Sequence, residues 1–155
     1  MGAEARLRLL LGALGVLGLG ISVYLTILHY EGGSPVCLAG GESCATVQES
    51  EYADLAGIPV PLIGVFGYLT ISAAAAIPGD PGRFLGVFAG LVGVGFSIYL
   101  TYLELFVIEA ICQWCVASAV VIALALAIAL VRAVRFGGRD SVRLEETDDE
   151  SKGAG

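Results

Sequence analysis

Four uncharged, strongly apolar stretches alternate with short polar segments along the chain. They cover residues 9–28, 58–77, 84–103 and 111–131. A helix of about 20 apolar residues is long enough to cross a bilayer core, whereas the core of a secretory signal runs only about 7–15 residues. All four stretches therefore predict membrane spans. We expect an all-α integral membrane protein, a four-transmembrane-helix bundle occupying residues 1–135.

The composition agrees with this fold class. The 155 residues have a mean hydropathy of +0.85, and only 15% of them are charged, against roughly 25% in soluble domains. Residues 136–155 are glycine-rich and then acidic, without apolar periodicity. This pattern predicts a disordered cytoplasmic tail, with an interaction tail as the alternative.

The basic residues predict the orientation of the bundle. The segments before the first span, between the second and third, and after the fourth contain every Lys and Arg: Arg6, Arg8, Arg83, Arg132, Arg135, Arg139, Arg143 and Lys152. The connections 29–57 and 104–110 contain none. Since Lys and Arg favour the cytoplasmic side, both termini are expected there, and all four cysteines are expected on the opposite side, where disulfides persist.

Candidate redox chemistry lies in two cysteine pairs. Cys112 and Cys115 form a C-x-x-C at the start of the fourth span, where a helix N-terminus favours the thiolate. Cys37 and Cys44 lie in the connection 29–57, around the flexible Gly40-Gly41. We expect this outer redox loop to contain a short extracytoplasmic helix over residues 45–56, with Gly57 as its C-cap.

An internal repeat relates the two halves of the chain. Residues 20–28 and 95–103 share Gly, Ser, Tyr, Thr and two Leu, and the offset of 75 residues also separates Cys37 from Cys112. This similarity favours two parallel structural repeats, with coincidence as the alternative. The many glycines of the spans predict close helix packing.

Other interpretations of the polar residues compete with redox chemistry. Four cysteines are enough for a zinc site, but no second C-x-x-C and no suitably spaced His completes the usual pattern, so we expect no metal. The cysteines could instead brace a non-catalytic tetraspan scaffold through static disulfides. Trp114 either anchors the membrane interface or stacks on a cofactor, and His29 is expected at the interface.

Taken in order, these motifs resemble the bacterial branch of the vitamin K epoxide reductase family. The similar elements are Tyr24-Leu-Thr, Cys37, Cys44, Ser50, the segment 57–64, Tyr99-Leu-Thr and Cys112-Gln-Trp-Cys115. Together they cover nearly all of the chain except the tail.

The resemblance implies a membrane thiol–quinone oxidoreductase that supports disulfide formation. Cys115 would face the quinone, menaquinone or ubiquinone, and Ser50 would bond one of its oxygens. The alternative for Ser50 is a hydroxyl bonded to the backbone. Cys112 would exchange with Cys44, and Cys37 would meet the protein partner.

The resemblance also indicates where the protein works and what it does not do. The expected partner is a separate DsbA-like thioredoxin-fold thiol oxidase, and the expected location is a bacterial cytoplasmic membrane, without nucleic-acid binding. Vertebrate members have polar residues at the positions of Val60 and Ala119. Reduction of vitamin K epoxide is therefore not expected of this chain.

Overall fold

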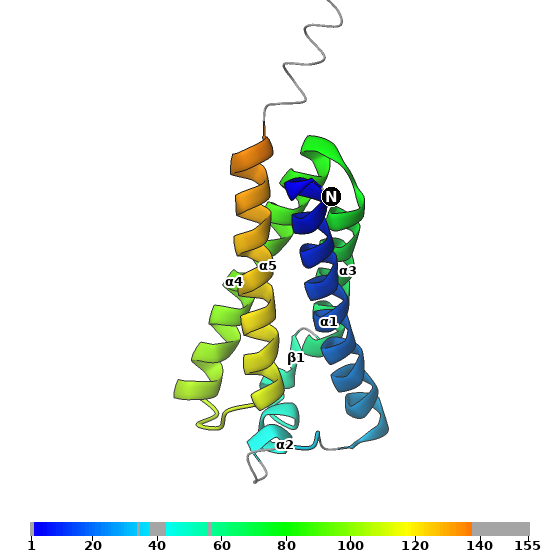
Figure 1. The fold of residues 1–155 in the computed structure, drawn as a ribbon. Helices are drawn as coiled ribbons and strands as arrows, with labels where there is room; N and C mark the ends of the chain where they lie inside the picture. Colours follow the sequence, from blue (N-terminus) through cyan, green and yellow to red (C-terminus); the bar gives the residue numbers. More distant parts are fainter. Residues whose placement is uncertain (1, 34, 38–42, 56, 138–155) are drawn as a thin grey trace, which may run out of the picture.

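The computed structural model describes residues 2–33, 35–37, 43–55 and 57–137. Its long helices are α1 (Ala3–Glu31), α3 (Val60–Ala76), α4 (Gly79–Phe106) and α5 (Gln113–Phe136). Between α1 and α3 lie a short helix α2 (Ser43–Gln48), a 3-10 turn η1 (Glu51–Ala53) and two short strands, β1 (Asp54–Leu55) and β2 (Ile58–Pro59). The four long helices run side by side, with α2 at the end of the bundle opposite the N-terminus (Figure 1). The predicted all-α membrane bundle and its loop helix are confirmed.

Each predicted span corresponds to one long helix. By length and composition, α1, α4 and α5 are able to cross a membrane, and α3 is a shorter apolar helix of 17 residues. At 1.5 Å per residue α3 is about 25 Å long, close to the minimum for a bilayer core. The predicted tail lies outside the described residues beyond residue 137, as does Gly40-Gly41.

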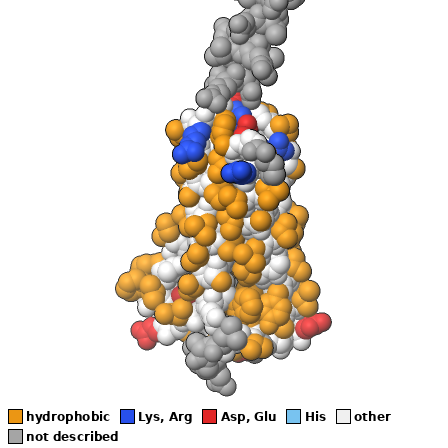
Figure 2. Space-filling view, viewed as in Figure 1, with side chains coloured by type: hydrophobic (Ala, Val, Ile, Leu, Met, Phe, Trp, Pro, Cys, Tyr) orange, Lys and Arg blue, Asp and Glu red, His pale blue; other side chains and the backbone are white. Residues whose placement is uncertain are grey.

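Most apolar side chains point outward from the bundle. Only 33%, 11% and 22% of the most apolar windows of α1, α4 and α5 are buried inside it, and Phe84 is 75% exposed. Hydrophobic side chains cover the length of the visible face, while Lys and Arg gather near one end (Figure 2). So much exposed apolar surface is unusual for a soluble monomer, and lipid is the solvent that suits it.

The interior is narrow and depends on small residues. α1 packs between α3 and α5, and α4 packs against the same two helices. Leu11, Ile71 and Ala125 are completely buried at the centre. Gly18 faces the ring of Tyr68 so closely that a Cβ at this position would overlap the ring. The predicted use of glycine for close packing therefore applies to Gly18.

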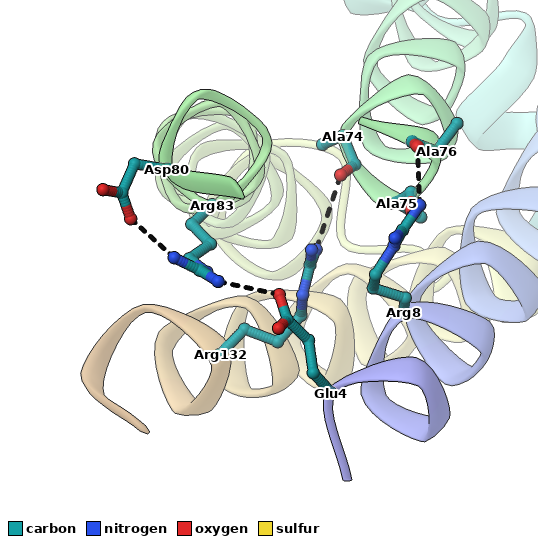
Figure 3. A network of polar contacts seen from close by, with 8 residues as sticks. All are labelled: Glu4, Arg8, Ala74, Ala75, Ala76, Asp80, Arg83 and Arg132. Carbon is teal, nitrogen blue, oxygen red and sulfur yellow. Dashed lines mark hydrogen bonds and ion pairs between the residues drawn. The ribbon is translucent and has the colours of Figure 1, made fainter. Parts of the chain in front are cut away.

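Charged side chains connect the helices at the end of the bundle that holds the N-terminus, which we call the arginine end (Figure 3). The Arg83 guanidinium, 5% exposed, donates to Asp80 Oδ1 at 2.6 Å and to Glu4 Oε1 at 2.9 Å, which joins α4 to α1. Pairing with carboxylates lowers the cost of burying this cation. Arg83 therefore has a structural role in addition to its expected role in orientation.

Two further arginines hold the last carbonyl groups of α3. Arg8 donates to the oxygens of Ala75 and Ala76 at 2.9 and 2.6 Å, and the buried Arg132 donates to Ala74 at 3.4 Å. The final carbonyls of a helix have no partner within the helix. Guanidinium groups from α1 and α5 supply these partners (Figure 3).

The loop helix is shorter than the sequence predicted. α2 ends at Gln48, and the predicted helix over residues 45–56 is wrong in its extent. The hydroxyl of Ser50 donates to the carbonyl of Val47 at 2.8 Å, which competes with continuation of the helix. Gly57, with φ of +81°, lies between β1 and β2 rather than capping a helix, and the paired strands bring Leu55 opposite Ile58.

Candidate redox site

The loop cysteines form a disulfide beside the bundle. Cys37 and Cys44 are bonded, with their Cα atoms 6.2 Å apart. Cys44 lies in the first turn of α2 and is completely buried, whereas Cys37 is half-buried. The two sulfur atoms of the bond thus differ in their exposure, because α2 packs Cys44 against the interior.

The second pair forms the start of α5, as the sequence predicted. Cys112 is the N-cap residue, and its Sγ accepts the backbone N–H of Cys115 at 3.4 Å. The first N–H groups of a helix lack partners within it, so a sulfur at this position acts as the capping acceptor. Both cysteines are free thiols. The donated N–H and the helix dipole favour negative charge on the Cys112 sulfur.

The two pairs meet in one buried cluster. Cys44, Val47 and Cys112 form its centre, and Cys37 and Cys115 are among the apolar side chains packed against it. A thiol–disulfide exchange needs a sulfur within reach of the attacking thiolate. Cys44, on α2, and Cys112, at the start of α5, are packed in the same cluster.

Trp114 fastens the loop to α5. Its indole N–H donates to the carbonyl of Val36 at 3.0 Å, and its ring lies 5.1 Å from that of Tyr24 on α1. Val36 immediately precedes Cys37. These contacts hold one end of the disulfide loop against the first turn of α5.

A cavity of about 460 Å³ opens among the long helices, and Cys115 is part of its wall. Its wall is mostly apolar and includes residues of α1, α3, α4, α5 and the loop. The polar or ionisable side chains of this wall are those of Ser22, Gln48, Ser50, Tyr52, Tyr68, Thr70, Ser97, Thr101, Glu104, Cys115 and Ser118. A mostly apolar space with a few polar groups is typical of a site for a small organic ligand.

Tyr68 and Ser118 form a polar contact within this wall. The Tyr68 hydroxyl lies 2.8 Å from both the carbonyl and the hydroxyl oxygen of Ser118, which links α3 to α5. Ser50 also lines the cavity, and its hydroxyl donates to the Val47 carbonyl. A hydroxyl has one proton to donate, so in this conformation Ser50 is able only to accept a further hydrogen bond.

Glu104 is the residue of the site that the sequence analysis missed. It is 5% exposed, and its Oε2 accepts the backbone N–H of Cys112 at 3.1 Å. Glu104 and Cys115 also lie in the same cavity wall. The signal in the sequence is an acidic residue directly after an uncharged stretch, in a connection that contains no Lys or Arg to pair with it.

The connection from α4 to α5 brings Glu104 to the cysteines. After α4, the N–H groups of Val107 and Ile108 both bond to the Leu103 carbonyl, and Ala110 bonds back to the Glu104 carbonyl at 3.1 Å. Glu109 adopts a positive φ of 55° within this turn. The chain thereby folds back on the end of α4 and places Cys112 beside the Glu104 carboxylate.

Comparison with known proteins agrees with this arrangement. The pattern of the vitamin K epoxide reductase family matches residues 9–130, which include all four cysteines. The chain belongs to the vitamin K epoxide reductase family. The resemblance carried by the motifs is therefore confirmed. The chain is also 35% identical over 66 residues to the Arabidopsis thaliana protein named thiol-disulfide oxidoreductase LTO1. That alignment covers 43% of this chain and 18% of the plant protein.

In this member of the vitamin K epoxide reductase family, most of the predicted site residues lie at the same end of the bundle. All four cysteines contribute to one cluster, and Ser50 and Cys115 line one cavity. Trp114 does not belong to the described cavity wall, and it packs instead on Tyr24 and the loop.

Proposed function

We propose that this protein is a membrane thiol–quinone oxidoreductase, which reoxidises a separate thioredoxin-fold thiol oxidase and thereby supports disulfide formation. The observation that carries the proposal is the position of the C-x-x-C. Cys112 lies in one buried cluster with the loop disulfide, and Cys115 borders the apolar cavity. Electrons entering at the loop have a path of adjacent sulfur atoms to the cavity.

The cavity supports a quinone as the electron acceptor. A quinone ring with an isoprenoid tail is flat and apolar, and it carries two carbonyl oxygens as its polar groups. The wall offers the matching chemistry, with apolar side chains from four helices and hydroxyl groups at Tyr68 and Ser118. Val60 and Ala119 also belong to this wall and bring no polar group. This favours quinone over an epoxide substrate.

The exchange begins outside the bundle. A thiolate of the reduced partner attacks Cys37, which breaks the loop disulfide, forms a mixed disulfide and releases Cys44. The partner's second thiol then closes its own disulfide and releases Cys37. Cys37 is the more exposed sulfur of the pair, which supports its assignment as the point of attack.

The electron pair then passes to the C-x-x-C. Cys44 attacks Cys112 in the oxidised C-x-x-C, and Cys37 resolves the resulting Cys44–Cys112 disulfide, so that Cys112 and Cys115 become free thiols. The cysteines of the structure are in this state, with the loop oxidised and the C-x-x-C reduced. Cys112 and Cys115 finally close their disulfide and deliver two electrons and two protons to the quinone.

The distribution of charge supports an orientation in the membrane. Arg8, Arg83 and Arg132 lie near the end of the bundle that holds the N-terminus, whereas α2, with Cys44, and the start of α5, with Cys112 and Cys115, lie at the opposite end. Positive residues favour the cytoplasmic side. We therefore place both termini in the cytoplasm and the cysteines outside the cytoplasmic membrane of a bacterium.

The test follows the redox state of a reduced thioredoxin-fold oxidase added to membranes that contain the protein, with and without added quinone. We expect rapid oxidation of the partner by the wild-type protein only when quinone is present, and none by Cys115→Ala. Gly20→Ala is the control variant, which carries a substitution without a steric conflict, since a Cβ at this position has nothing within 4 Å. Wild-type rates in Cys115→Ala would refute the path, and a wild-type protein that neither oxidises the partner nor consumes quinone would favour the scaffold interpretation.

A further inference from the structure

We propose that Glu104 is a catalytic base that takes the proton of the Cys115 thiol and passes it to the bound quinone. This inference rests on the proposed function and adds a residue to it. Glu104 and Cys115 line the same cavity, and the Glu104 carboxylate accepts the backbone N–H of Cys112 at 3.1 Å, which holds it beside the C-x-x-C. Among the described residues of the cavity wall, Glu104 is the only one with a carboxyl group.

The burial of Glu104 is difficult to explain by structure alone. A carboxylate that is 5% exposed carries a large desolvation cost unless a cation compensates it. Among the described residues, Glu104 takes part in no salt bridge. Its bond to the Cys112 N–H requires only an oxygen acceptor, which a neutral Gln of the same shape would supply at lower cost. A titratable side chain at this buried position therefore indicates a role beyond holding the backbone.

The chemistry of the final step needs a proton acceptor at this position. The thiolate, not the thiol, is the reactive form of cysteine, and the N–H donated by Cys115 already favours a thiolate at Cys112. The Cys115 sulfur has no such donor among the hydrogen bonds described. The carboxylate of Glu104, which shares the cavity wall with Cys115, supplies this base.

The step balances in atoms and charge. Glu104 accepts the Cys115 proton, and the bond between the Cys112 and Cys115 sulfurs forms as two electrons leave for the quinone. Glu104 passes the Cys115 proton to one quinone oxygen, and solvent returns to the other oxygen the proton that Cys112 lost on becoming a thiolate. The products are the Cys112–Cys115 disulfide, a quinol and the original Glu104 carboxylate.

The test uses the full chain in liposomes. The protein is fully reduced, freed of reductant and mixed anaerobically with a short-chain benzoquinone, whose loss of absorbance reports the step. Glu104→Gln keeps an acceptor for the Cys112 N–H and removes the base. We expect it to slow quinone reduction by at least about 100-fold, the lower end for loss of a general base. Glu104→Asp should restore part of the rate.

A second measurement separates a base from a structural support. Exchange between the reduced loop pair and the oxidised C-x-x-C, followed without quinone by acid quenching and thiol labelling, should keep its rate in Glu104→Gln. The exposed Glu109, in the same connection, provides the matched control, and Glu109→Gln should reduce quinone at the wild-type rate.

The pH profile provides a third readout. The titratable groups that share this site with Glu104 are Cys112, Cys115, Tyr52 and Tyr68. Without the base, the reaction depends on ionisation of the Cys115 thiol by solvent, so the rate of Glu104→Gln should rise with pH more steeply than that of the wild type.

Two results would overturn the assignment of Glu104 while the proposed function stands. One is quinone reduction by Glu104→Gln within twofold of an active wild type. The other is an equal loss in both the quinone step and the exchange step, with an unchanged pH profile, which would make Glu104 a structural support. If the wild-type protein itself reduces no quinone, the proposed function falls together with this inference.

Discussion

The contact between Gly18 and Tyr68 predicts a large difference between two neighbouring glycines of α1. A Cβ at Gly18 would overlap the Tyr68 ring, whereas a Cβ at Gly20 meets nothing within 4 Å. Gly18→Ala and Gly20→Ala change the same helix in the same way, so the difference in helix propensity between Gly and Ala cancels between them. What remains is the steric cost at Gly18.

The structure indicates how large this cost is. Tyr68 is 4% exposed, and its hydroxyl is held by Ser118 on α5. Displacing the ring would break hydrogen bonds worth about 1 kcal/mol each, and displacing α1 would open its packing against α3. Overpacking of a close-packed interior costs typically about 1–3 kcal/mol. We expect Gly18→Ala to be less stable than Gly20→Ala by about this amount.

The assay is reversible unfolding in mixed micelles, followed by the fluorescence of Trp114, the sole tryptophan of the chain. A double-mutant cycle with Tyr68→Ala isolates the contact, because Gly18→Ala should cost little once the ring is absent. Gly18→Ala should also slow quinone reduction, since Tyr68 lines the cavity. Equal unfolding free energies for Gly18→Ala and Gly20→Ala would refute the described packing of α1 on α3.

Three further predictions concern the relay, the loop and the orientation. Cys37→Ala should accumulate a Cys44–Cys112 disulfide, detected as a linked peptide after digestion without reductant, and Cys44→Ala should trap the external partner on Cys37; a Cys37–Cys112 link without a partner adduct would reverse the order. Trp114→Phe loses the 3.0 Å bond to the Val36 carbonyl, so exchange between the two cysteine pairs should slow severalfold while quinone reduction by the prereduced C-x-x-C keeps its rate; slowing of the quinone step alone would favour cofactor stacking. A reporter fused to the C-terminus should be cytoplasmic, and an impermeant thiol reagent should label the reduced loop cysteines from outside intact cells; an external reporter would overturn the orientation.

The helices and the positions of the cysteines could be predicted because they depend on local patterns. Uncharged stretches of about 20 residues leave few alternatives to helices in lipid, and the C-x-x-C lies at a helix start as expected. The loop was harder to predict. Its residues 45–56 include good helix formers, but the hydrogen bond of Ser50 and the strand pairing across Gly57 override that propensity.

The position of Glu104, the proposed base, and the wall of the cavity could not be predicted because they depend on contacts between distant segments. Glu104 reaches Cys112 only because the turn at Glu109 folds the connection back on α4. The internal repeat likewise matches residues in the sequence without predicting what surrounds them in the structure. Tyr24 packs on Trp114, whereas its counterpart Tyr99 is 46% exposed, so matched residues have different surroundings.

The most direct measurement of the central claim is the amount of quinone that the fully reduced protein consumes in the absence of any partner. If both pairs deliver electrons through the C-x-x-C, the wild-type protein should reduce two quinones per chain, and a variant with Cys37 and Cys44 replaced by Ala should reduce one. A variant with Cys112 and Cys115 replaced by Ala should reduce none, although its loop pair is intact. Reduction of one quinone per chain by this last variant, at the wild-type rate, would contradict the account.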